Sequence, residues 1–250
     1  MQDKFKRIFL TAGSIFFWIL LWHIAAIFAN RNLLFKIPLP TETLKVFLKL
    51  SVTDDFWYAV GNSLLHIIAG FVIAVILGLI CGLLSGSSDA FKIFTGPVSR
   101  LIRSMPVAAL IILAWLWVPS TTIPSFIAFL MVFPIVWLQI ETALLSIDNK
   151  LIEMAEVFGM SRINIIKDIK APYVLPALRN SAITGLGFAW KSGVAAEVIC
   201  NPTGSIGALL SGAKNNLQYA EVFAIVLTII VLSLVMENII KFFWRDAQND

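Results

Sequence analysis

The chain has 250 residues, of which 59% are hydrophobic and only 14% are charged, and its mean hydropathy is +0.88. Soluble domains carry charge on about a quarter of their residues, so this composition excludes an ordinary soluble protein and favours a multi-pass membrane protein. The net charge of +4 does not indicate nucleic-acid binding, because the cations gather between apolar runs, as they do in membrane proteins.

Six apolar runs can each cross a bilayer, because a helix rising 1.5 Å per residue needs ~20 residues to span a ~30 Å hydrocarbon core. In chain order they cover residues 8–28, 60–84, 98–118, 123–143, 178–199 and 220–243. We interpret the first run as an uncleaved anchor, because it is too long for a secretory signal and no A-x-A pattern follows it. The sequence therefore predicts an all-α membrane protein with six transmembrane helices.

The placement of Lys and Arg predicts the orientation, because cytoplasmic loops retain these cations. With the N-terminus in the cytoplasm, thirteen cations fall on the cytoplasmic side, five fall outside, and Lys191 lies within the fifth span. The thirteen are Lys4, Lys6, Arg7, Lys92, Arg100, Arg103, Lys150, Arg162, Lys167, Lys170, Arg179, Lys241 and Arg245; the five are Arg31, Lys36, Lys45, Lys49 and Lys214. Six crossings then return the C-terminus to the cytoplasm.

A short amphipathic helix is predicted between the first two spans, in the sequence "PLPTETLKVFLKL". Thr41 can cap this helix, and Leu44, Phe47 and Leu48 share one of its faces. We expect the helix to lie in the outer membrane interface, where anchoring is the simpler role and recognition the alternative.

Small residues recur every four positions in the second span, at Gly70, Ala74, Gly78, Gly82 and Gly86. This spacing lets two backbones approach closely, and it drives helix association in lipid. The glycines therefore predict a helix-packing stripe inside a compact bundle.

The most polar long segment lies between the fourth and fifth spans, at residues 148–172. Asp148 can cap a first helix, Gly159 can end it, Ser161 can cap a second helix, and Pro172 is expected to stop that one. One apolar face is predicted on each helix, formed by Leu151, Ile152, Ala155 and Phe158 and by Ile165, Ile166 and Ile169. Such a pair suits either docking of another protein or contact with anionic lipid.

The spacing of Glu153, Ala155, Gly159, Ile169 and Pro172 resembles the EAA loop in permease subunits of bacterial ABC importers. Further stretches are similar to the nitrate/sulfonate/taurine-type permeases over nearly the whole chain. They are "PLP" at 38–40, "NSLLHIIAGF" at 62–71, "RSMP" at 103–106, "APYVLPAL" at 171–178, "AWKSGVAAE" at 189–197 and "GSIG" at 204–207. The loop after the third span, "WVPSTTIP", departs from the glycine-containing turn that is common in that family.

The resemblance implies a type I ABC importer permease-like bundle that acts as a homodimer in the bacterial inner membrane. Two cytoplasmic ABC ATPase subunits would hold the EAA helices in their clefts, and an extracytoplasmic substrate-binding protein would deliver the substrate. Gly159 would set the angle between the helices, and Glu153 would orient the loop. The implied substrates are small anions such as nitrate, sulfonate or taurine, with thiamine-precursor pyrimidines or other vitamins as the alternative.

The resemblance and the hydropathy together predict two units in the chain. Residues 1–59 would form the N-terminal anchor helix and the outer interfacial helix. Residues 60–250 would form the permease core, with five transmembrane helices and the cytoplasmic EAA loop.

Trp190, Lys191 and Glu197 are predicted to line the translocation pathway, since an ionisable residue at membrane depth usually faces a polar cavity or a partner. Lys191 would then favour anionic substrates. The alternative is a structural ion pair between Lys191 and a carboxylate on another helix, such as Glu141 or Glu237.

No catalytic, cofactor or metal site is expected. The stretch from Gly185 to Ser192 reads G-x-x-x-x-W-K-S, but Trp190 replaces a glycine that phosphate-binding loops need. His23 and His66 offer no metal-ligand spacing. A separate subunit would therefore hydrolyse ATP. The competing classes are an ion-coupled secondary transporter, which typically has inverted repeats or broken helices with paired carboxylates, and a membrane-embedded enzyme.

Overall fold

The computed structural model describes residues 2–31 and 36–245, and every element of regular structure in this part is a helix, which confirms the predicted fold class. Residues 1, 32–35 and 246–250 of the two predicted units lie outside the described part. In chain order the helices are α1 (Gln2–Ala29), α2 (Pro40–Leu50), α3 (Asp54–Ser87), α4 (Asp89–Ser104), α5 (Val107–Trp115), α6 (Ile123–Leu145), α7 (Asn149–Val157), α8 (Arg162–Asn164), the π-helix η1 (Ile165–Lys170), α9 (Ala171–Cys200), α10 (Ile206–Asn215) and α11 (Tyr219–Arg245).

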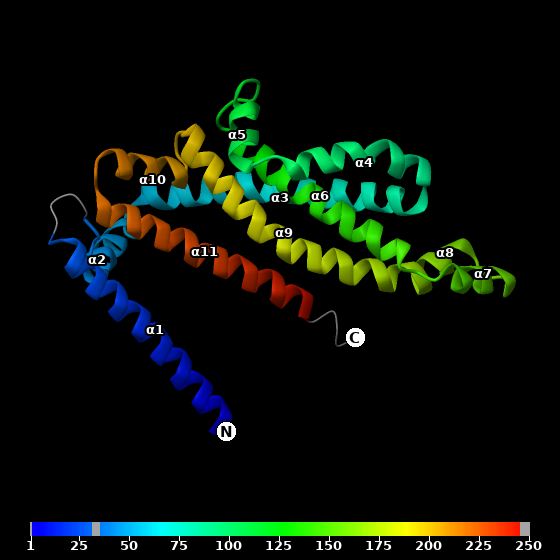
Figure 1. Ribbon diagram of the computed structural model, residues 1–250, viewed down its shortest axis with the longest axis horizontal. Helices are drawn as coiled ribbons and strands as arrows, with labels where there is room; N and C mark the ends of the chain where they lie inside the picture. The colour runs from blue at the N-terminus through cyan, green and yellow to red at the C-terminus, as the bar shows by residue number, and fades with distance from the viewer. Residues whose placement is uncertain (1, 32–35, 246–250) are drawn as a thin grey trace.

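The centre of the bundle is formed by α3, α6 and α9, which lie side by side, with α11 along α9 (Figure 1). Ile67, Val132, Ile140 and Ala189 are fully buried among these helices. One end of the bundle carries α7 and α8, and the opposite end carries α2 and α10 (Figure 1). We call these the α7 end and the α2 end.

The glycine stripe of α3 lies against α6. A Cβ atom added to Gly78 would lie 2.8 Å from Val136 Cβ, and one added to Gly82 would lie 2.6 Å from Ile140 Cβ. At Gly70 the added atom would collide with the carbonyl group of Ser125. The stripe thus lets α3 and α6 pack backbone against backbone, as the four-residue spacing predicted.

Within residues 2–31 and 36–245, four helices are long and apolar enough to cross a membrane. They coincide with four of the six predicted spans: Phe9–Ala29, Asp54–Ser87, Ile123–Leu145 and Tyr219–Ile240. The predicted span 178–199 lies within the 30-residue helix α9, which is long enough to cross but is not among these four apolar helices. The charged and small residues of α9 make this helix less apolar. Most of these residues are buried or half-buried against neighbouring helices.

The predicted third span, 98–118, was wrong as a single straight helix. The chain breaks between α4 and α5, whose axes are bent by 102°. Pro106 explains the break, because a residue that precedes proline avoids the helical conformation. Met105 is accordingly extended, with φ −79° and ψ 134°. The pair α4–α5 forms a broken span or a re-entrant segment.

The expectation that Pro172 stops the second loop helix was also wrong. The helical backbone continues from α8 through η1 into α9, and Pro172 lies in the first turn of α9. Proline in a helix lacks an N–H group and clashes with the carbonyl group four residues earlier. Here the wider π turn precedes it, with Ala171 N–H donating to Ile166 O, and this turn accommodates the ring.

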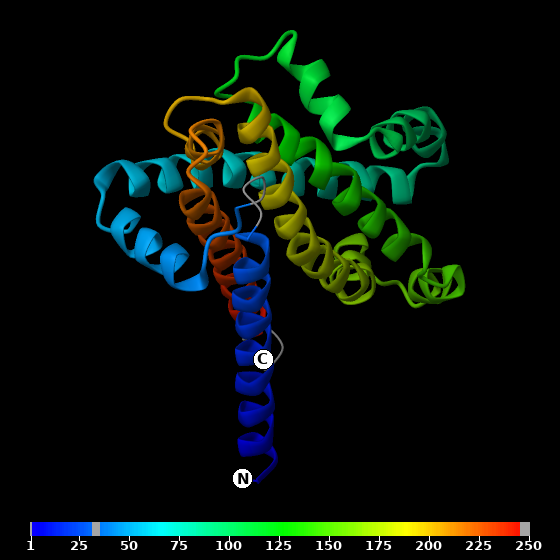
Figure 2. The same cartoon turned by 60° about the vertical axis from the view of Figure 1, so that its left-hand side comes forward.

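Helix α1 projects away from the other helices, as Figure 2 shows. Near its C-terminal end the ring of Trp22 stacks on Phe223 of α11, with 5.7 Å between ring centroids.

Helix α2 begins at Pro40, so the predicted cap at Thr41 was wrong. The Glu42 carboxylate instead accepts the backbone N–H of Leu39, which is the N-cap residue. Thr43 is buried as α2 packs along α11, while Leu44 and Leu48 of the predicted apolar face point outward.

Candidate functional site

The loop between α6 and α9 has the predicted helix, glycine turn and helix. The Asp148 carboxylate accepts the N–H of Lys150 at 3.0 Å, and Ser161 Oγ accepts the N–H of Asn164 at 3.3 Å. Gly159 has a φ of +72°, in the region where a side chain is strained. The next residue, Met160, donates its N–H to Ala155 O at 3.0 Å, which closes the helix end.

The buried faces of this loop differ from the predicted ones at two positions. Ala155, Ile165 and Ile169 are buried as expected, but Phe158 is 79% exposed and Ile166 is 58% exposed. Phe158 follows the last residue of α7, so helical periodicity no longer applies to it. Ile166 lies in the π turn, whose larger number of residues per turn rotates it away from its predicted neighbours.

Exposed apolar side chains therefore gather at the end of the loop. We call this set the apolar tip; its members are Met154, Val157, Phe158, Ile163 and Ile166. Glu153 is exposed beside it. An apolar patch rimmed by charged residues is typical of a surface that another molecule covers.

Lys191 is exposed on α9, about 30 Å along the helix from its first residue. Tyr173, Asn180 and Thr184 are also exposed, and at ~100° per residue all four side chains fall within ~40° of the helix circumference. We call these four residues the polar stripe. The i, i+4, i+11 spacing from Asn180 through Thr184 to Lys191 is visible in the sequence, although sequence analysis singled out Lys191 alone.

Of the two carboxylates suggested as partners for Lys191, Glu141 is engaged elsewhere. Glu141 instead pairs with Lys92, with 3.3 Å between Nζ and Oε1, and it accepts a hydrogen bond from Ser85 Oγ. Lys191 thus presents its charge on an open face of the single subunit.

Trp190 lies inside the protein, unlike Lys191. It is 1% exposed, and its Nε1 donates to Ile229 O at 3.0 Å, which joins α9 to α11. This residue holds the bundle together in the structure, and its ring does not reach the polar stripe.

Glu197 is likewise 1% exposed and belongs to a hydrogen-bonded junction of three helices. Its Oε2 accepts from Ser63 Oγ of α3 at 2.8 Å and from the backbone N–H of Gly207 at 3.0 Å. Ser63 Oγ in turn accepts the N–H of Ile206 at 2.9 Å. A carboxylate at the N-terminus of α10 is well placed to bind free N–H groups and the helix dipole. The "GSIG" stretch could have indicated this junction.

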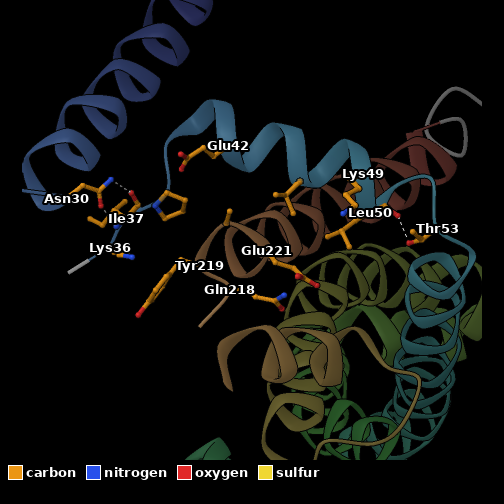
Figure 3. A pocket seen from close by; sticks show the side chains of 13 residues that line it. Asn30, Lys36, Ile37, Glu42, Lys49, Leu50, Thr53, Gln218, Tyr219 and Glu221 are labelled. Atoms are coloured by element: carbon orange, nitrogen blue, oxygen red, sulfur yellow. Dashed lines mark hydrogen bonds between the residues drawn. The ribbon is translucent and has the colours of Figure 1, made fainter. Parts of the chain in front are cut away.

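An open groove lies at the α2 end, between α2, the start of α11 and the segment that precedes α2 (Figure 3). Its volume is about 640 Å³, and its charged lining residues are Lys36, Glu42, Lys49 and Glu221. Asn30 supports one wall by donating to Ile37 O at 3.0 Å and accepting from Ile37 N at 3.1 Å. The groove could not be predicted from the sequence, because two segments distant along the chain form it.

The stretch from Gly185 to Ser192 is part of the continuous helix α9. A Cβ atom added to Gly185 would lie 2.8 Å from a methyl carbon of Val132, so this glycine serves helix packing. A phosphate-binding loop has a different backbone, with N–H groups turned toward the ligand.

The sequence model of the binding-protein-dependent transport system inner membrane component matches residues 74–247. The putative aliphatic sulfonates transport permease protein SsuC of Bacillus subtilis is 25% identical to this chain, covering 84% of it and 76% of SsuC. The taurine transport system permease protein TauC of Escherichia coli is 24% identical, covering 93% and 86%. The bicarbonate transport system permease protein CmpB of Synechococcus elongatus is 23% identical, covering 98% and 91%.

Among solved structures, an inward-facing conformation of the MetNI methionine ABC transporter matches 76% of this chain and 95% of the solved chain. The TM-score is 0.54 at 16% sequence identity, so this likeness shows the fold alone. The sequence match covers more than half of the chain, from the middle of α3 to the end of α11. The chain therefore belongs to the binding-protein-dependent transport system inner membrane components, the permease subunits of ABC importers.

Proposed function

We propose that this permease subunit carries a small anion of the sulfonate, taurine, nitrate or bicarbonate kind across the membrane, driven by a separate ATPase. The relatives that match most of the chain are named for the transport of aliphatic sulfonates, taurine and bicarbonate. Their shared chemistry is a small molecule with a negatively charged oxygen-bearing group.

The polar stripe of α9 is the observation that carries this proposal. A face with a lysine, an asparagine and a threonine is costly against lipid, so it is expected to face water or a partner helix. Two copies of the chain with their stripes toward each other would enclose a polar path, and Lys191 would supply its positive charge. This arrangement favours a homodimer and an anionic substrate.

The loop between α6 and α9 is the proposed contact for the ATPase. The apolar tip would enter a cleft of that subunit, with Glu153 orienting the loop at its rim. Ala155 and Ile169 hold the loop against the bundle, and Gly159 sets the turn.

Because the helix continues past Pro172, it can transmit motion from the ATPase contact to the membrane-spanning part of α9. Because α8, η1 and α9 form one uninterrupted helical rod, a displacement of the loop would move the helix that carries Lys191. ATP-driven motion could thus change access to the polar stripe without a flexible joint between them. The chain would lie in the bacterial plasma membrane with both termini and the α7 end in the cytoplasm, and the binding protein would approach the α2 end.

Replacing Lys191 by Met is expected to lower anion uptake about ten-fold, which corresponds to the loss of a charge-assisted contact worth roughly 1.5 kcal/mol. Assembly and basal ATP hydrolysis should be unchanged, because the Lys191 side chain is exposed and does not belong to the packed core of the bundle. Uptake is measured in proteoliposomes that contain the permease, its ATPase and the binding protein.

Lys191→Arg is the matched control, since it keeps the charge at the same position. This variant should transport the anion within about two-fold of the wild type, a difference well below that expected from losing the charge. Equal anion uptake by Lys191→Met and the wild type would remove Lys191 from the pathway. Loss of uptake of an uncharged vitamin in the same variant would favour a packing role instead of charge recognition.

A further inference from the structure

A second cationic site lies between α4 and α6, near the α7 end and on different helices from the polar stripe. The cavity has a volume of about 400 Å³, which is within the range of small-molecule sites. Its polar and aromatic lining residues are Lys92, Ser99, Arg100, Arg103, Trp137 and Glu141. Three of these residues are cations and one is an anion, so the lining carries an excess of positive charge.

Helix α4 is amphipathic: its polar face lines the cavity, and its apolar face is exposed. Lys92, Ser99 and Arg103 lie on one face at i, i+7 and i+11, and all three line the cavity. The opposite face carries Phe94 and Leu101, which are 82% and 57% exposed. The charged face of α4 is thus turned toward α6.

Two residues that line this cavity each carry a buried hydrogen-bond donor with no partner in the described part of the chain. Ser99 Oγ and Trp137 Nε1 are both unpaired, although the two residues are only 3% and 4% exposed. Buried polar groups are nearly always hydrogen-bonded, and the indole N–H can only donate. Because both residues line the cavity, a ligand bound there is the candidate acceptor for the two atoms.

The two arginines of the cavity have no carboxylate partner in the described part of the chain, unlike Lys92. Arg100 Nε donates to Gly96 O at 3.3 Å, and Arg103 Nε donates to Ser99 O at 3.4 Å. These bonds use only the Nε–H groups, so the terminal N–H groups of both arginines remain for a ligand. Glu141 is occupied by Lys92 and Ser85, so it does not compensate for the two arginines.

We propose that this cavity binds an oxyanion: a phosphate, sulfate or sulfonate group held by Arg100 and Arg103 and by the N–H and O–H of Trp137 and Ser99. Planar guanidinium forks match the oxygens of such groups, and charge-assisted bonds to them are strong. The group could belong to a free anion or to the headgroup of an anionic lipid. The volume of the cavity leaves room for the organic part that carries it.

The test uses the full-length protein in nanodiscs of phosphatidylcholine, with the melting temperature as the readout. In the first arm sodium sulfate is titrated against sodium chloride of equal ionic strength. In the second arm phosphatidylglycerol is added to the lipid without sulfate. A saturable stabilisation by sulfate would identify a free anion, and one by phosphatidylglycerol alone would identify a lipid headgroup.

Three variants make the result specific to this cavity. Trp137→Phe removes the N–H donor, and the double variant Arg100→Gln, Arg103→Gln removes both charges. Each should raise the ligand concentration that gives half-maximal stabilisation at least about ten-fold. Lys150→Gln, which alters an exposed cation outside the cavity, should respond as the wild type does. Should the double variant fail to assemble, Trp137→Phe decides the matter alone. The proposal is overturned if neither sulfate nor phosphatidylglycerol stabilises the wild type, or if all variants respond equally.

Discussion

Replacing Gly70 by Ala is expected to destabilise the bundle by about 3 kcal/mol, the upper part of the usual range for overpacking. The added Cβ would collide with the carbonyl group of Ser125 on α6. Backbone cannot yield as the end of a flexible side chain can, so α3 and α6 must separate along the stripe. The measurement is the melting temperature of the purified protein in nanodiscs.

Gly61→Ala is the matched control, because it makes the same substitution on the same helix. No atom lies within 4 Å of a Cβ added at Gly61. In a helix interior Ala is more favourable than Gly by about 0.8–1.0 kcal/mol, so the control should melt at the same temperature or slightly higher. Equal melting temperatures for the two variants would show that the glycine stripe does not hold α3 against α6.

Replacing Gly159 by Val is expected to abolish most uptake while the chain still inserts into the membrane. The positive φ of Gly159 costs a residue with a side chain about 1–3 kcal/mol, and a β-branched residue is the least able to adopt it. The turn would then relax and displace the apolar tip relative to α9. The quantity to measure is the number of ATP molecules hydrolysed for each substrate molecule imported.

Gly159→Asn separates the backbone effect from the added bulk. Asn tolerates the left-handed conformation, and the space around Gly159 is open, with no atom within 4 Å of an added Cβ. Asn201 already adopts such a conformation at the end of α9, with a φ of 51°. The Asn variant should therefore retain most coupling. If Gly159→Val kept the wild-type ratio of hydrolysis to import, the loop would lose its proposed role.

Local chemistry explains which features could be predicted from the sequence. The caps at Asp148 and Ser161 and the turn at Gly159 depend on residues within a few positions of one another. The glycine stripe was predictable for a similar reason, since its four-residue period fixes one face of α3 regardless of the partner helix.

Features that depend on the surrounding fold were missed. The helix continues past Pro172 because the π turn before it accommodates the proline ring, and π turns have no clear sequence pattern. The partner of Glu141 proved to be Lys92 of α4, a helix whose position is set by the bend at Pro106. The junction around Glu197 joins three helices. From the sequence alone, a buried structural carboxylate cannot be distinguished from one that lines the pathway.

The proposed function is tested most directly by measuring which energy source drives transport. The permease is reconstituted into liposomes with its ATPase and binding protein, and uptake of a sulfonate, taurine, nitrate or bicarbonate is followed with and without ATP. Uptake of at least one of these anions is expected only when ATP, the ATPase and the binding protein are all present, and it should not depend on an ion gradient. Uptake by the permease alone, driven by a proton or sodium gradient, would contradict it and identify a secondary transporter.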